Sequence, residues 1–209
     1  MAISIKVCGL CSGEQINSLD AMGVDFCGII FHEASPRFAG NRLISVELKN
    51  KILQCKPTGV FVNESGEDIL KRIDEYGLKA VQLCGDESPE LCRQIQKNSE
   101  VIKVFHMDER FEFAQLKNYE GSCDYFLFDT KTNLHGGSGK KFNWELLQSL
   151  KTATPFFLSG GIDVRDIRQI AAFSHPAFFG VDINSRFEFS PGNKNIGLIQ
   201  TFYDQIKSI

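Results

Sequence analysis

The sequence predicts a single-domain (β/α)8 barrel, the TIM-barrel architecture, over residues 1–209. Short apolar runs alternate eight times with helical patterns along the chain. These runs are mostly continuous rather than interrupted at every second residue, as parallel strands covered on both faces require. Glycines and small polar residues follow the last two runs, and in such a barrel the loops after strands seven and eight are the usual phosphate site.

The expected strands follow one another at regular intervals. They are the apolar runs over residues 3–7, 24–31, 57–62, 79–83, 101–105 and 124–128, and the two runs that begin at Phe156 and Phe178. A doubly wound open sheet would show the same alternation. The closed barrel is favoured because no Gly-x-Gly-x-x-Gly follows the first run and no Walker loop is present.

Helix start signals lie between these runs. A capping residue stands before the expected helices at Ser12, Ser65, Ser88 and Asp163. Ser12 with Gln15 reads as a capping box, and Gly23 ends that first helix. Further helices are expected over residues 45–55, 110–117, 144–147 and 196–206, the second of them weaker than the others.

Composition limits the kind of protein this can be. Hydrophobic residues make up 43% and charged residues 23% of the chain, as in an ordinary globular protein, and the net charge of −3 gives no footprint for nucleic acid or anionic membrane. No apolar run approaches the ~20 residues that span a bilayer. Seven cysteines are scattered without a framework, and no export signal is visible. We therefore expect a cytoplasmic protein with no nucleic-acid or membrane partner.

Five polar side chains fall at the ends of the expected strands or in the loops after them, which face one mouth of a barrel. They are Cys8, Arg37, Cys84, Asp129 and Asp182. The set contains a thiol that could act as a base, a carboxyl that could act as an acid, and a cation. Each has a plainer interpretation: a buried thiol, a capping carboxyl, a solvated arginine. Cys8-x-x-Cys11 could also be a redox pair or half a metal site, but no second such pair and no paired histidines accompany it, so no metal is expected.

Eight motifs in register resemble one enzyme family. They are Lys6-Val7-Cys8-Gly9-Leu10, Ser35-Pro36-Arg37, Gly59-Val60-Phe61-Val62-Asn63, Val81-Gln82-Leu83-Cys84-Gly85-Asp86-Glu87, Phe128-Asp129, the stretch from Gly136 to Trp144, Ser159-Gly160-Gly161 and the stretch from Gly180 to Ser185. Together they cover nearly the whole chain. The sequence resembles the phosphoribosylanthranilate isomerases of tryptophan biosynthesis.

That resemblance implies a reaction and a set of roles. The reaction is the cofactor-free Amadori rearrangement of N-(5-phosphoribosyl)anthranilate, a small phosphorylated substrate, by a monomer or homodimer. Asp129 matches the family's general acid, Cys8 its general base, and Arg37 the residue that contacts the anthranilate carboxylate. The remaining substrate contacts are expected at Gly137, Gly139, Gly160, Gly161, Asp182, Asn184, Ser185 and Arg186.

The chain departs from the family pattern in three places. Cys84 stands where a histidine is usual, Arg186 stands where a glycine is usual, and residues 130–135 lengthen the loop after Asp129. Arg186 could add a direct contact to the substrate phosphate, or it could point outward into solvent. Residue type alone does not decide between the two.

Other functions on the same fold fit less well. A related sugar-phosphate isomerase of histidine biosynthesis is expected to end strand one with an aspartate, where this chain has Cys8. Indole-glycerol-phosphate synthase is expected to place lysines at strand ends within the barrel, and the expected strand ends of this chain have none. A non-catalytic barrel that binds a phosphorylated ligand would keep the glycines but could lose Cys8 or Asp129, and this chain has both.

Overall fold

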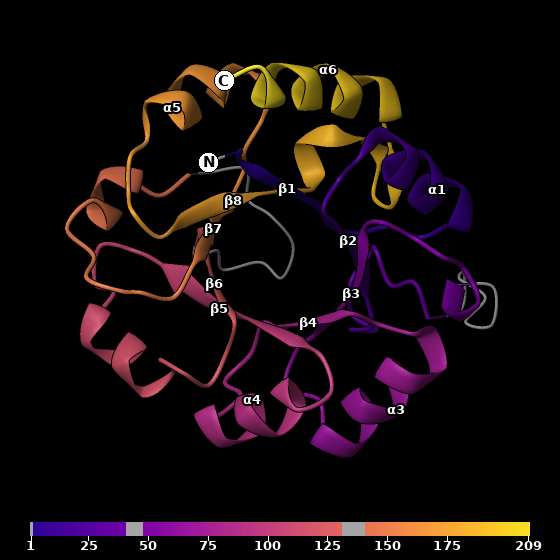
Figure 1. Cartoon of the computed structure of the whole chain (residues 1–209), viewed down its shortest axis with the longest axis horizontal. Helices are drawn as coiled ribbons and strands as arrows, with labels where there is room; N and C mark the ends of the chain where they lie inside the picture. The colour runs from indigo at the N-terminus through magenta and orange to yellow at the C-terminus, as the bar shows by residue number, and fades with distance from the viewer. Residues whose placement is uncertain (1, 41–47, 131–140) are drawn as a thin grey trace.

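Eight parallel strands close into a barrel in the computed structural model, which describes residues 2–40, 48–130 and 141–209. The strands, in barrel order, are β1 (Ser4–Val7), β2 (Phe26–Ile30), β3 (Lys56–Phe61), β4 (Ala80–Leu83), β5 (Glu100–Met107), β6 (Tyr125–Thr130), β7 (Phe156–Leu158) and β8 (Phe178–Ile183). β1 pairs with both β2 and β8, which closes the ring (Figure 1). The predicted (β/α)8 barrel is confirmed.

The helices form an outer layer around this ring (Figure 1). They are α1 (Gly13–Met22), α3 (Gly66–Tyr76), α4 (Pro89–Gln96), α5 (Ile167–Ala172) and α6 (Ile196–Lys207). The side chains of Ser12, Ser65 and Ser88 accept N–H groups of the first turns, which confirms three predicted caps. The Gln15 side chain reaches back to the N–H of Cys11 rather than to that of Ser12, so the first cap is not a strict capping box.

Several connections differ from the predicted helices. The segments expected over 110–117 and 144–147 are short 3-10 helices, η1 (Phe113–Asn118) and η2 (Trp144–Leu147). Such short segments make only one or two turns, the length at which 3-10 geometry is common. Residues 45–47 of the helix expected over 45–55 lie outside the described residues. Of residues 48–55, only Leu48 and Lys49 are helical.

Two elements after β8 were not predicted. A 3-10 turn, η4 (Ser185–Phe187), leads into a hairpin of β9 (Glu188–Ser190) and β10 (Asn193–Lys194). After β7, Asp163 caps the 3-10 turn η3 (Val164–Asp166) through a capping box with Asp166. This confirms the predicted Asp163 cap. The Pro191-Gly192 dipeptide between β9 and β10 is a turn signal that could have predicted the hairpin.

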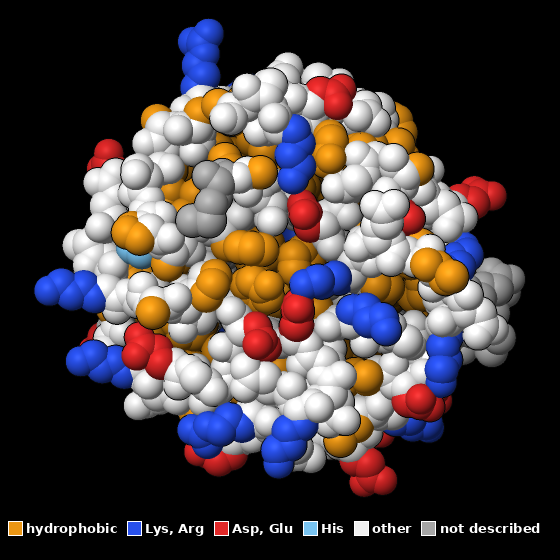
Figure 2. Space-filling view, in the orientation of Figure 1, with side chains coloured by type: hydrophobic (Ala, Val, Ile, Leu, Met, Phe, Trp, Pro, Cys, Tyr) orange, Lys and Arg blue, Asp and Glu red, His pale blue; other side chains and the backbone are white. Residues whose placement is uncertain are grey.

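Apolar side chains fill the amino-terminal half of the barrel interior. A cluster separate from the larger core under the helices consists of Phe26, Ala80, Ile102, Val104, Leu127 and Phe157, with Tyr125 and Phe179 packed against it. Phe26 and Tyr125 are the first residues of their strands, so this cluster closes the amino end. Figure 2 shows hydrophobic side chains at the centre of the ring, among acidic and basic ones. The Lys56–Glu100 ion pair lies at this amino end, with Lys56 Nζ over the Phe26 ring, whereas the predicted site residues lie toward the carboxyl end.

A buried ion pair holds the turn after β4. Lys103 Nζ donates to Glu87 Oε2 at 2.9 Å and to the Gly85 carbonyl at 2.7 Å. Glu87 in turn accepts the backbone N–H groups of Asn63 and Gly85. This pair fixes the segment that carries Cys84.

Within the described part of the chain, no helix combines the length and hydrophobicity needed to cross a bilayer.

Candidate active site

An ion pair lies at the centre of the carboxyl half of the barrel. Lys6 on β1 and Asp182 on β8 are register partners, and Lys6 Nζ donates to Asp182 Oδ1 at 2.9 Å. Ser159 Oγ donates to the other carboxylate oxygen at 3.1 Å. Burial acts to lower the pKa of Lys6, but the charge and hydrogen bond of Asp182, together with smaller contributions from Cys8 and Cys84, raise that pKa above its ordinary value. Lys6 is therefore a permanent cation, which the sequence interpretation had overlooked as part of a strand.

The predicted base, Cys8, lies beside this cation at the end of β1. A Cβ atom added at Gly28 would come 3.0 Å from Cys8 Sγ and 3.1 Å from Lys6 Nζ, so the thiol and the ammonium group flank the same point. Burial raises the pKa of Cys8, Lys6 and Lys194 act to lower it, and Asp182 acts to raise it. The net direction is upward, so the free site holds a thiol with two cations positioned to stabilise its thiolate.

The predicted acid, Asp129, lies near the other member of the pair. Burial and then the charge of Asp182 raise the pKa of Asp129 to about 6, while His106 and Lys6 act to lower it. The Thr130 N–H donates to Asp129 Oδ1 at 2.8 Å. Gly160 lies close by at φ +92, where an added Cβ atom would come 3.0 Å from the same oxygen. Burial and Asp182 thus keep a fraction of Asp129 protonated near neutral pH.

His106, one of four histidines scattered along the sequence, joins this group. His106 on β5 is the register partner of Asp129 on β6. Its Nε2 lies 3.1 Å from the Cys84 carbonyl, which can only accept, so Nε2 carries a proton. Cys84 itself accepts a hydrogen bond from Gln82 at 3.2 Å, and burial raises its pKa to about 12. The thiol at position 84 is therefore neutral, and the His106 imidazole contacts the backbone carbonyl of the same residue.

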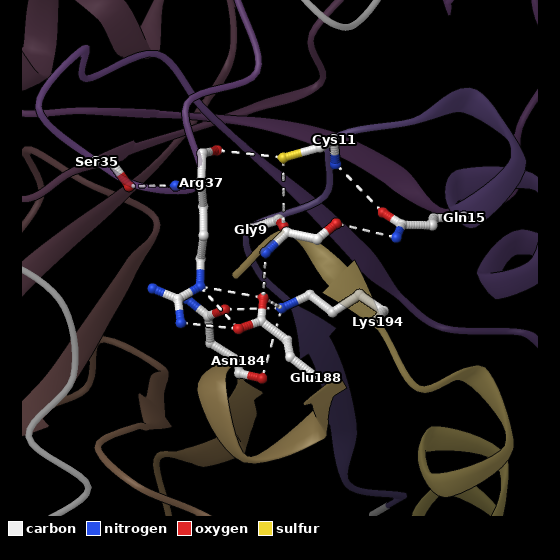
Figure 3. Close-up of polar contacts among 9 residues, drawn as sticks. Gly9, Cys11, Gln15, Ser35, Arg37, Asn184, Glu188 and Lys194 are labelled. Atoms are coloured by element: carbon white, nitrogen blue, oxygen red, sulfur yellow. Dashed lines mark hydrogen bonds and ion pairs between the residues drawn. The ribbon is translucent and has the colours of Figure 1, made fainter. Parts of the chain in front are cut away.

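Arg37 is buried rather than solvated, and it is held by Glu188 (Figure 3). Its Nε and Nη2 donate to Glu188 Oε2 at 2.9 and 2.7 Å. Lys194 Nζ donates to Glu188 Oε1 and to Asn184 Oδ1, both at 2.7 Å. Burial acts to raise the pKa of Glu188, but the hydrogen bonds from Arg37 and Lys194 outweigh it and lower that pKa, so Glu188 is a carboxylate. Neither Glu188 nor Lys194 was predicted.

The expected phosphate site is only partly described. Gly160 and Gly161 both have positive φ, +92 and +70, and their N–H groups donate to no other residue within the described ranges. Asn184 and Ser185 follow β8 at the start of η4, and the Arg186 side chain on that turn is exposed. Gly137 and Gly139 lie outside the described residues, as does most of the lengthened 130–135 loop.

The second thiol of the Cys8-x-x-Cys11 motif points elsewhere. Cys11 Sγ lies 3.5 Å from the Arg37 carbonyl, against the loop after β2. Among the residues that the structure places, no three His, Cys, Asp or Glu side chains come together as a metal site would require.

Comparisons with known proteins agree on one family. The family model described as N-(5'phosphoribosyl)anthranilate (PRA) isomerase matches residues 5–205. A protein of that name from Phocaeicola vulgatus is 42% identical over 204 residues, which cover 97% of each chain. The crystal structure of phosphoribosyl anthranilate isomerase from Thermotoga maritima superposes with a TM-score of 0.84 at 33% identity, covering 99% of this chain and 100% of that one.

A further solved structure holds a ligand. It is a phosphoribosyl anthranilate isomerase in complex with reduced 1-(o-carboxyphenylamino)-1-deoxyribulose 5-phosphate, with a TM-score of 0.81, 28% identity, and coverage of 99% of this chain and 100% of that one. The carboxyl group, the sugar chain and the phosphate of that molecule are three chemically distinct parts.

The raised pKa of Asp129 predicts that this residue costs stability. Below about pH 3 the carboxyl is mostly protonated in both the folded and the unfolded chain. As the pH rises from 3.8 to about 6, the unfolded chain loses its proton before the folded one, so stability falls through that window. Asp129→Asn should therefore raise the unfolding free energy at pH 8 by about 2–3 kcal/mol, with little gain at pH 4. Urea unfolding at both pH values measures this.

Asp163→Asn is the matched control with the opposite sign. The Arg165 hydrogen bond lowers the pKa of Asp163 to about 2, so this substitution should lower stability at pH 8. An Asp129→Asn variant that is no more stable than wild type at pH 8 would contradict a desolvated carboxylate at position 129.

Proposed function

Because the chain belongs to the N-(5'-phosphoribosyl)anthranilate isomerase family, we propose that it carries out that isomerisation with Asp129 as the general acid and Cys8 as the general base. The observation that carries these roles is the Lys6–Asp182 pair between them. Its anion, Asp182, adds to the effect of burial in raising the pKa of Asp129. Its cation, Lys6, acts to lower the pKa of Cys8, in opposition to the larger effect of burial. A general acid must be protonated when substrate binds, and a general base needs its anionic form stabilised; the raised pKa of Asp129 and the cations beside Cys8 support these two roles.

The first proton transfer opens the sugar ring. Asp129 gives its proton to the ring oxygen while the C1'–O bond breaks and the anthranilate nitrogen lone pair forms a C1'=N bond. The products are an iminium ion, a free hydroxyl group and the Asp129 carboxylate. Because the acid must be protonated when substrate binds, a pKa of about 6 is better suited to this step than the ordinary value of 3.8.

The second proton transfer makes the enol. Cys8 removes the proton from C2', the C–H electron pair forms the C1'=C2' bond, and the iminium electrons return to nitrogen. Loss of the hydroxyl proton at C2' and protonation at C1' then give the 1-deoxyribulose product. The thiolate is the active form of Cys8, and Lys6 and Lys194 are the cations that favour it.

Arg37 is proposed to bind the anthranilate carboxylate. Its guanidinium is buried, so a hydrogen bond there is shielded from water, and a planar guanidinium can bind a carboxylate through two parallel hydrogen bonds. The N–H groups of Gly160 and Gly161, with the turn that begins at Asn184, are proposed to bind the phosphate. The direct phosphate contact of Arg186 stays a prediction; its exposed side chain also fits the outward alternative.

Substitution of either catalytic group should abolish most turnover. Cys8→Ser replaces a thiolate with a much weaker base, and Asp129→Asn removes the acidic proton. Each should lower kcat by about a hundredfold or more, the usual effect of losing a general acid or base. Cys92→Ser is a control thiol substitution on α4 that should leave kcat near the wild-type value. Near-normal turnover by a folded Cys8→Ser or Asp129→Asn variant would remove that residue from its proposed role.

Arg37→Lys tests the carboxylate contact. Lysine keeps the charge but cannot form two parallel hydrogen bonds to a carboxylate, so kcat/KM should fall by about tenfold or more. Arg93→Lys, at an exposed pair on α4, is the control and should have no effect. If kcat/KM of Arg37→Lys equals that of wild type, another group binds the carboxylate.

A further inference from the structure

The side chain of Glu188 has no oxygen left for a substrate. Oε2 accepts from Arg37 Nη2 at 2.7 Å and from Arg37 Nε at 2.9 Å. Oε1 accepts from Lys194 Nζ at 2.7 Å, from the Gly192 N–H at 3.0 Å and from Arg37 Nε at 3.0 Å. Figure 3 shows the carboxylate between the two cations. Glu188 can therefore affect the reaction only indirectly, through the side chains of Arg37 and Lys194 that it holds.

The contacts of Glu188 fix the direction of the Arg37 guanidinium. They occupy Nε and one N–H of Nη2, while Nη1 has no hydrogen-bond partner among the residues in the described ranges. Because the guanidinium is planar, the edge formed by Nη1 and Nη2 still presents two parallel N–H groups to a second carboxylate. Rotation of the group toward any other direction would break the bonds to Glu188.

The same three side chains leave an excess positive charge. Arg37 and Lys194 contribute two positive charges and Glu188 one negative charge, and their side chains are only 10%, 0% and 3% exposed. A buried charge is costly unless another charge balances it. Asn184 Oδ1 also accepts from Lys194 Nζ, but an amide carries no net charge. A bound carboxylate would complete two cations with two anions.

We propose that Glu188 is the positioning residue for the substrate carboxylate: it holds Arg37 with one guanidinium edge open, and Lys194 keeps the cluster cationic so that an anionic aromatic acid is selected. This inference rests on the proposed role of Arg37. The hairpin of β9 and β10, which carries Glu188 and Lys194, thereby becomes the specificity element of the site.

Two probes that differ only in the carboxyl group test the proposal. One is reduced 1-(o-carboxyphenylamino)-1-deoxyribulose 5-phosphate, and the other is the same molecule with an unsubstituted phenyl ring. Calorimetric titration gives the affinity of each for wild type and for Glu188→Gln. The variant should bind the carboxylated probe at least about tenfold more weakly, and its affinity for the other probe should change by less than about threefold.

Kinetics give a second readout. Since the carboxylate is held alike in the ground state and the transition state, Glu188→Gln should raise KM by more than it lowers kcat. Glu188→Asp keeps the charge but shortens the side chain, so it should show the same selective loss to a smaller degree, and it serves if Glu188→Gln does not fold. Glu100→Gln, in a half-buried pair with Lys56 at the amino end of β5, is the control.

Equal weakening of both probes, or of neither, in the Glu188 variants would overturn the proposal. Arg37→Lys separates this outcome from a failure of the proposed contact between Arg37 and the substrate carboxylate. If Arg37→Lys discriminates between the probes and the Glu188 variants do not, Arg37 binds the carboxylate without help from Glu188. If Arg37→Lys does not discriminate either, the role proposed for Arg37 is wrong.

Discussion

The buried ion pair between Lys6 and Asp182 is the constraint on which the site depends. The two residues are register partners on the first and last strands, so the pair forms only when the barrel closes. Cys8 lies beside its cation, which acts to lower the pKa of that thiol, and its anion adds to burial in raising the pKa of Asp129. The pairing of β1 with β8 therefore does two things: it closes the barrel, and it brings the two charges of the site together.

The division of the barrel interior into two halves follows from the same requirement. Aromatic and aliphatic side chains fill the amino half, and the polar groups gather above them at the carboxyl ends of the strands. Because the apolar cluster excludes water from the amino half of the barrel, the charges of Lys6 and Asp182 act on their neighbours with little screening. Gly28 and Gly160 have no side chain at the points where Cys8, Lys6 and Asp129 come closest. An active site of this kind is built at some expense in stability.

The sequence predicted the barrel, its strands and the positions of Cys8, Arg37 and Asp129 at or after strand ends, because apolar runs and the residues that follow them are local features. It did not predict the partners that give these residues their properties. Lys6 reads as one residue of a strand, and only the register with β8 pairs it with Asp182. His106 comes beside Asp129 only through the pairing of β5 with β6. Glu188 meets Arg37 across 151 residues of sequence, a contact that no local pattern encodes.

The titration of Asp129 in wild type and in Asp182→Asn tests the central claim most directly. Carbon-13 NMR of the aspartate carboxyl groups, assigned with the Asp129→Asn variant, gives the midpoint for this one residue. The account predicts a wild-type midpoint of about 6. In Asp182→Asn it predicts a clearly lower one, because the variant removes an anion and leaves the Lys6 cation unopposed. The same midpoint in both proteins would contradict control of Asp129 by the Lys6–Asp182 pair.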